Sequence, residues 1–251
     1  MAGSKRRWLK WLGLSVLAVV LLVVAAVVVA NEPRPVGMAG AEADALARRI
    51  EQTIDLAAWQ RTGAVRFAFG GRNEHLWDRE RRLHRVRWDD VEVLRAFDTG
   101  RGVATRGGQP VHGEQLAELL DAAYAHWAND SFWLNPLAKM FDEGVSRALV
   151  KLDDGTQGLL ISYSSGGVTP GDAYLWVLGD DGLPAYWKMW VSILPVGGAK
   201  STWEAWEKLP TGARVSTLHR TFGTTLKVSP VEAAATLAEL EPGADPFAAL
   251  Q

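Results

Sequence analysis

Residues 162–206 constrain the fold more than any other stretch, because short aromatic runs alternate there with turn-forming residues. Residues 173–178 are aromatic and β-branched and form a short run, which is typical of a strand. The sequence Gly-Asp-Asp-Gly at 179–182 supplies a turn, since Asp bonds its own backbone and Gly tolerates positive φ. The chain returns through residues 185–194 and again through residues 201–209. These segments predict a wide, aromatic antiparallel sheet with no obvious catalytic group on it.

The first 30 residues predict export from the cytoplasm. Residues 1–10 are basic, and residues 11–30 form an apolar run without a single charge. About 20 apolar residues suffice for a helix to cross a bilayer, and flanking Lys and Arg stay on the cytoplasmic side. Two interpretations remain open. The run is longer than the core of a typical cleaved signal, which favours a retained anchor, while the small residues before Asn31 suit cleavage after Ala30.

The composition excludes several functional classes. The net charge of −2 argues against a nucleic-acid partner, because phosphate binding needs a basic surface. The chain has no cysteine, which rules out disulfides, thiolate metal sites, thiol catalysis and a lipid-acylated cysteine. We expect no metal and no cofactor.

Residues 31–40, which contain Pro33 and Pro35, predict a linker, and residues 41–251 predict one domain. An amphipathic helix is expected over 41–59. The hydrophobic period changes from 2 to 3.6 in mid-chain and then changes back, which predicts two neighbouring helices inside a long series of strands. The expected strands are 64–69, 74–79, 82–88, 91–98, a hairpin within 102–111, then 147–152, 158–163, 173–178, 185–194, 201–209, 213–222 and 224–228. The two mid-chain helices are expected over 113–127 and 132–141, with Asn129-Asp130-Ser131 as a cap between them, and a last helix is expected from Ser229 to about Leu240.

Ten to twelve antiparallel strands need closure or curvature to protect their edges. Mid-chain helices can fill the open side of a curved sheet. We therefore predict an α+β fold, a curved and unclosed antiparallel β half-barrel with helices on its concave face, preceded by one N-terminal transmembrane or signal helix. A closed lipocalin-like barrel is the alternative, and it would place no helix pair in mid-chain.

Catalytic templates fail on this sequence, which has no nucleophile elbow, phosphate-binding loop or zinc-protease motif. His75 and His84 are interpreted as a solvated cross-strand pair. The Gly-rich loop at 166–172 is interpreted as a structural loop. A hydrolase would have only His219 and Asp172 as candidate groups. We therefore predict a protein that is not an enzyme.

Aromatic and methionine side chains are the remaining feature. They fill a core in the simplest interpretation, but a curved sheet with such residues under helices also suits a cavity for an apolar ligand. The predicted ligand-binding residues are Phe132, Trp133, Met140, Phe141, Trp176, Trp187 and Met189. The predicted function is the binding of a lipid or of a lipoprotein acyl chain. The alternative is an envelope sensor or scaffold that binds another protein through an exposed Trp190 or Trp206.

Two segments carry a resemblance to a known family: Asn129-Asp130-Ser131-Phe132-Trp133-Leu134, and residues 164–172 followed by Tyr174-Leu175-Trp176. With the order of elements from Ala41 to about Val228, they resemble an uncharacterised exported bacterial branch of the LolA/LolB-like superfamily of periplasmic lipoprotein carriers. The resemblance implies an open half-barrel with an apolar cavity for acyl chains. It also implies the bacterial cell envelope, with the domain either anchored to the inner membrane and facing the periplasm or free in the periplasm.

Overall fold

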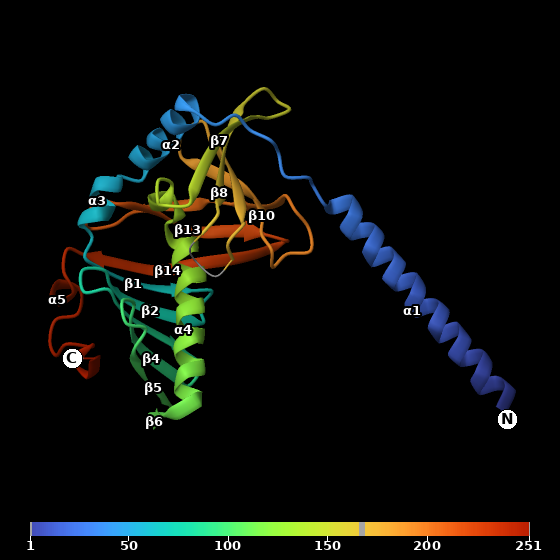
Figure 1. The fold of residues 1–251 in the computed structure, drawn as a ribbon, viewed down its shortest axis with the longest axis horizontal. Coiled ribbons are helices and arrows are strands. Elements are labelled where there is room, and N and C mark those ends of the chain that lie inside the picture. The colour runs from blue at the N-terminus through green and yellow to red at the C-terminus, as the bar shows by residue number, and fades with distance from the viewer. Residues whose placement is uncertain (1, 166–168, 251) are drawn as a thin grey trace.

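One open antiparallel sheet forms the body of the protein (Figure 1). The computed structural model describes residues 2–165 and 169–250. The sheet has 14 strands in the order β6-β5-β4-β3-β2-β1-β14-β13-β11-β10-β9-β8-β7, with β12 paired to β13. Within the described residues β6 and β7 do not pair with each other, so the sheet does not close. The predicted curved α+β half-barrel is confirmed.

The strands are β1 (Ala64–Phe69), β2 (Asn73–Asp78), β3 (Leu83–Trp88), β4 (Val91–Ala96), β5 (Gly102–Arg106), β6 (Gln109–Val111), β7 (Val145–Lys151), β8 (Gln157–Tyr163), β9 (Ala173–Leu178), β10 (Pro184–Trp190), β11 (Ala199–Thr202), β12 (Glu204–Lys208), β13 (Arg214–Thr221) and β14 (Thr224–Ala234). The helices are α1 (Ala2–Ala30), α2 (Ala41–Thr53), α3 (Leu56–Arg61), α4 (Gly113–Leu134) and α5 (Leu237–Leu240), with 3₁₀ turns η1 (Pro136–Lys139) and η2 (Ala248–Leu250).

The last long strand joins the two halves of the sheet. β14 pairs with β1, where Phe67 lies opposite Val231, and with β13 on its other side. The predicted helix from Ser229 is therefore wrong. Val228 and Ala233 of β14 are buried in the core. The pairing of β14 with its neighbouring strands therefore outweighs a local sequence pattern that is typical of a helix start.

The helix predicted over 41–59 is divided in two. Asp55 has a left-handed backbone (φ 51°), and its side chain accepts a hydrogen bond from the Ala58 N–H at 3.0 Å, which starts α3. Leu46 and Ile50 on α2 are buried against the sheet. The strand predicted over 201–209 is divided as well, since Trp203 turns into the core between β11 and β12.

The two predicted mid-chain helices are one long helix and a 3₁₀ turn. α4 runs for 22 residues through Asn129-Asp130-Ser131, and Pro136 opens η1. These three residues do not cap a helix because the Asp130 side chain lies in the core, where it contacts β2. α4 crosses the concave face of β1–β5 (Figure 1) and packs on Val86, Val93 and Ala104.

The opposite face of the sheet is covered by the chain ends. Leu76 and Leu94 pack against Phe247 from the C-terminal segment. Residues 31–38 run beside β7 and β10, and Met38 forms a β-bridge with Leu149. α1 extends away from the sheet (Figure 1). Its segment Trp11–Ala30 has a mean hydropathy of 3.2 and is 0% buried, so it is long and apolar enough to cross a membrane.

Candidate functional site

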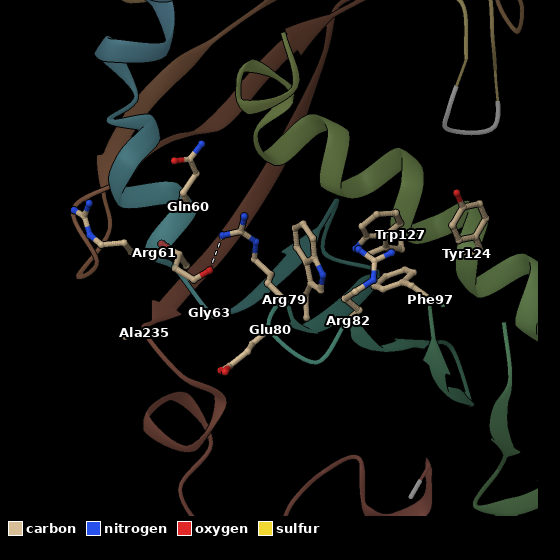
Figure 2. Close-up of a pocket in the computed structure, with 12 residues that line it drawn as sticks. Gln60, Arg61, Gly63, Arg79, Glu80, Arg82, Phe97, Tyr124, Trp127 and Ala235 are labelled. Carbon is tan, nitrogen blue, oxygen red and sulfur yellow. Dashed lines mark hydrogen bonds between the residues drawn. The ribbon is translucent and has the colours of Figure 1, made fainter. Parts of the chain in front are cut away.

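A pocket of about 620 Å³ opens on the concave side between the end of α3 and the middle of α4 (Figure 2). The β2–β3 turn forms its floor. It is lined by Gln60, Arg61, Thr62, Gly63, Trp77, Arg79, Glu80, Arg82, Phe97, Tyr124, Trp127 and Ala235. Aromatic rings and guanidinium groups therefore share one concave surface.

Trp127 of α4 holds the aromatic wall of the pocket together. Its ring centroid lies 4.3 Å from that of Phe97, 5.3 Å from that of Trp77 and 5.9 Å from that of Tyr124. Figure 2 shows Phe97 beside Trp127. Tilted and edge-on contacts of this kind suit the quadrupoles of the rings and fix their orientations. The wall is a broad and rigid apolar surface.

Arg79 places a positive charge beside this wall. Its guanidinium donates hydrogen bonds to the carbonyl oxygens of Trp59 and Thr62 at the end of α3. It also lies 4.5 Å from the centroid of the Trp59 ring and 5.2 Å from that of Trp77. Burial lowers the pKa of Arg79 to about 10, so the group remains charged at neutral pH. Across residues 2–165 and 169–250, no carboxylate forms an ion pair with it.

A buried polar network supports the wall from behind. The Asp130 side chain on α4 accepts hydrogen bonds from Asn73 at 2.7 Å and from His75 Nε2 at 2.8 Å, both on β2, and from Asn129 at 2.8 Å. His75 Nδ1 lies 3.1 Å from His84 Nε2 on β3. All three residues of this Asp-His-His series are at most 1% exposed. The series links α4 to two neighbouring strands.

The hydrogen-bond partners assign the tautomers. Because His75 donates from Nε2 to Asp130, its Nδ1 accepts, and His84 donates from Nε2. His84 Nδ1 then has no partner among the described residues. Burial, followed by the charges of His75, Arg95 and His126, holds the pKa of His84 well below its ordinary value. The series thus consists of two buried imidazoles aligned by one carboxylate, with the charged form of His84 disfavoured.

The network is in direct contact with the wall of the pocket. The His84 ring stacks on Phe97 with centroids 5.8 Å apart and lies 6.3 Å from Trp127. The solvated His75–His84 pair expected from sequence is therefore wrong, because both rings are buried between the sheet and α4. The two histidines do contact each other across the strands, but no local pattern indicates their burial, since Asp130 is 55 residues from His75.

The ligand-binding residues predicted from sequence lie together in a different place. They form one cluster under α2 and η1, in which Met140, Trp176, Trp187 and Met189 are buried and Phe132, Trp133 and Phe141 are partly buried. Trp187 has ring centroids 4.9 Å away in Trp133, Trp176 and Trp203. None of the predicted residues lines the pocket, so ligand binding by this cluster stays a prediction.

The other predicted candidates are also separate from the pocket. His219 is buried, donates a hydrogen bond from Nδ1 to the Thr202 carbonyl at 3.1 Å, and contacts Trp203. Asp172 accepts hydrogen bonds from the Thr169 hydroxyl at 2.6 Å and the Ser192 N–H at 3.0 Å, which hold its loop. Residues 166–168 of that loop lie outside the described residues. No interaction joins His219 to Asp172 in the described part of the chain.

The tryptophans proposed as protein contacts are half-buried. The Trp190 indole N–H donates to the Glu32 carbonyl at 2.8 Å, and that of Trp206 donates to the Pro184 carbonyl at 3.3 Å. The described residues hold no group of three or more His, Cys, Asp or Glu side chains suited to a metal ion.

Comparisons with known proteins give only distant similarity. No family model matches the chain, and no curated protein matches it. A crystal structure of a DUF1329 family protein from Desulfovibrio piger is 12% identical, covering 81% of this chain and 99% of that one, with a TM-score of 0.37. A domain assigned as an outer membrane lipoprotein-sorting protein from Vibrio parahaemolyticus is 7% identical, covering 80% and 95%, with a TM-score of 0.29. We infer function from the geometry of this chain alone.

The network predicts a specific loss of stability. Asp130→Ala leaves the buried donors of Asn73 and His75 without an acceptor, so the free energy of unfolding should fall by about 3 kcal/mol. Asp121→Ala, at an exposed position on the same helix, should change it by about 0.5 kcal/mol or less. Guanidinium unfolding of the full chain in detergent micelles measures both values. Equal effects of the two substitutions would show that Asp130 does not fasten α4.

Buried histidines predict acid sensitivity. Burial lowers the pKa of His219 to about 4, so between pH 6.5 and 4 the unfolded chain binds a proton that the folded chain does not. Stability must therefore fall as the pH is lowered, by about 2 kcal/mol from pH 7 to pH 5 for this residue. His219→Asn should remove that part of the pH dependence, and His112→Asn on the surface should not. An unchanged dependence in His219→Asn would contradict the assignment.

Proposed function

We propose that the domain binds an amphipathic molecule, a lipid or the acyl chain of a lipoprotein with an acidic group nearby, in the pocket between α3 and α4. The single observation that supports this proposal is the half-buried guanidinium of Arg79, which has no carboxylate partner in the described residues and lies beside an aromatic wall. Its hydrogen-bond partners, the carbonyl oxygens of Trp59 and Thr62, are neutral, so the positive charge has no counter-ion among the described residues. An anionic ligand would supply the missing partner.

The wall suits an apolar chain. Trp77, Phe97 and Trp127 present ring faces and edges that a methylene chain can cover, and their mutual contacts mean that little side-chain freedom is lost on binding. A volume of about 620 Å³ lies within the ~300–1,000 Å³ typical of small-molecule sites. The lining combines an aromatic wall with six polar or charged side chains, so it suits a ligand that has both an apolar part and a polar head group.

The charges suit an acidic head group. Arg61 and Arg79 line the pocket, whereas Arg82, which also lines it, is paired with Asp98. Glu80 is the acidic residue of the lining, and it is exposed at the turn. Among the described residues neither Arg61 nor Arg79 has a carboxylate partner, and Arg79 is the one beside the aromatic wall, which favours an anion over a neutral or cationic head group. The Thr62 hydroxyl of the lining bonds to the Ala58 carbonyl and to the Thr211 hydroxyl and not to a general base, so we propose binding without chemistry.

The location we propose is the cell envelope, outside the cytoplasm. Trp11–Ala30 is suited to cross a membrane, and the basic residues that precede it favour a cytoplasmic N-terminus. The aromatic cluster around Trp187 is a second candidate for the apolar part of the ligand, because its Phe132 and Trp133 are only partly buried. Binding of another envelope protein is the remaining alternative.

The proposal predicts two trends in affinity. Each further methylene of a saturated fatty acid should add up to about 0.8 kcal/mol, or about fourfold, until the pocket is full. A fatty acid should bind more tightly than the alcohol of equal length, because only the acid pairs with Arg79. A charge-assisted hydrogen bond of about 1.5–3 kcal/mol corresponds to roughly 10- to 150-fold. Titration calorimetry of the full chain in a non-ionic detergent measures both trends.

Matched variants locate the site. Arg79→Met should abolish the preference for acid over alcohol, while Arg101→Met, at an exposed position outside the pocket, should keep it. Trp127→Ala should lower the affinity for both the acid and the alcohol. Trp133→Ala should lower these affinities only if the aromatic cluster is the binding site. An affinity that is independent of chain length, or a preference for acid that survives Arg79→Met, would refute binding in this pocket.

A further inference from the structure

The residues that directly follow α1 are fastened to the domain. The Glu32 N–H donates to the Gly197 carbonyl at 3.0 Å, and the Gly197 N–H donates to the Asn31 side chain at 2.8 Å. The Glu32 carboxylate pairs with Lys188 at 2.6 Å, and its backbone carbonyl accepts from the Trp190 indole at 2.8 Å. The loop between β10 and β11 is thus bound to the first two residues after the membrane-length helix.

Gly197 shows how close this contact is. A Cβ at Gly197 would lie 2.4 Å from Trp190 Cδ1 and 2.7 Å from the Glu32 carbonyl oxygen. Such distances are sterically impossible, so the close packing of residue 32 on this loop requires a glycine here. The junction behind α1 is therefore a rigid attachment and not a flexible tether.

Two apolar tips are exposed beside this attachment. Ile193, in the β10–β11 loop, is 73% exposed, and Phe222, in the β13–β14 turn, is 61% exposed. The two segments are neighbours, because Ser201 on β11 pairs with Thr221 on β13 and the Thr221 hydroxyl donates to the Lys200 carbonyl. Figure 1 shows both on the side of the sheet that faces α1. The side chain of Lys200 between them is exposed and basic.

We infer that these two tips rest in the surface of the bilayer that α1 crosses. The apolar run ends at Ala30, and Asn31 already contacts Gly197, so the loop lies within about one residue, ~3.5 Å, of the end of the hydrocarbon span. The interfacial layer on each side of a bilayer is roughly 5–7 Å thick. A loop attached at that distance has its apolar tip at the depth of the lipid head groups.

The side chains at and beside these tips suit contact with a lipid bilayer. An isoleucine and a phenylalanine at loop tips bury apolar area in the interface, and a neighbouring lysine attracts anionic lipid. The inference depends on α1 remaining attached to the chain, and it does not depend on ligand binding in the pocket. A second copy of the chain or another protein on these tips would be a different result in the same experiment.

The absence of cysteine from the chain allows a direct test. Ile193→Cys and Phe222→Cys are labelled with an environment-sensitive NBD fluorophore in the full chain, which is placed in nanodiscs of phosphatidylglycerol and phosphatidylethanolamine. Val103→Cys, on β5 and 39% exposed, is the control. We expect a blue-shifted emission, a several-fold rise in intensity and quenching by doxyl-labelled lipid at positions 193 and 222, and none of these at 103.

Each outcome decides the inference. Emission at positions 193 and 222 that equals that at 103 and is not quenched by doxyl lipid would overturn it. A blue shift without doxyl quenching would place a protein surface on the tips and would overturn it too. Isolation of the protein from membranes or from the cell envelope with Asn31 as its first residue would show that α1 is cleaved, and it would overturn the inference. Loss of fatty-acid binding in the pocket would leave it unaffected.

Discussion

The carboxylate of Asp130 lies between α4 and the sheet with almost no access to water, and the position of that helix depends on it. Burying an isolated carboxylate costs several kcal/mol, so the group is stable there only because Asn73, His75 and Asn129 donate hydrogen bonds to it. These donors come from β2 and from α4 itself. These hydrogen bonds form together only when α4 lies at one position on the sheet. The apolar contacts around Leu119 and Ala123 are less directional and would allow the helix to lie at several positions.

The consequence of this position is the pocket. Because Asp130 is fixed against His75, Trp127, about one helical turn before it, lies over Trp77 and Phe97. Tyr124, about one turn before Trp127, contacts the Trp127 ring. The wall of the pocket is therefore a product of the network and not of local sequence. Burial disfavours the charged form of His84 beside this wall and of His219 beside Trp133 and Trp203, so acid conditions that charge either imidazole weaken the packing around it.

Much of the fold could be predicted from sequence because it depends on local periodicity. Residues 64–69 and 173–178 alternate or are aromatic and β-branched, and they are strands with those bounds. The predictions that are wrong concern residues whose secondary structure depends on partners distant in the sequence. Ser229 precedes a proline and an acidic residue, as at a helix start. β14 nevertheless continues through it, because its backbone forms hydrogen bonds with β1. Asp130 has the local features of a cap, yet its partners lie on β2 and it belongs to a continuous helix.

The candidate site was harder to predict than the fold for the same reason. Large aromatic residues in 132–189 indicated an apolar cluster, and they do lie together, but their rings pack on one another. The pocket combines residues from α3, β2, the end of β4 and α4, and its charge, Arg79, is ordinary in sequence. Only the folded chain shows that this guanidinium lies over two tryptophans and has no carboxylate partner among the described residues.

The most direct measurement of the central claim is photo-crosslinking of the full chain with a diazirine-bearing fatty acid, followed by peptide mapping. The account predicts adducts on residues 59–63, 77–82, 97 and 124–127, which form the pocket. It also predicts that excess unlabelled fatty acid prevents these adducts. Adducts confined to residues 132–141 and 176–189 would place the ligand in the aromatic cluster instead and would contradict the claim.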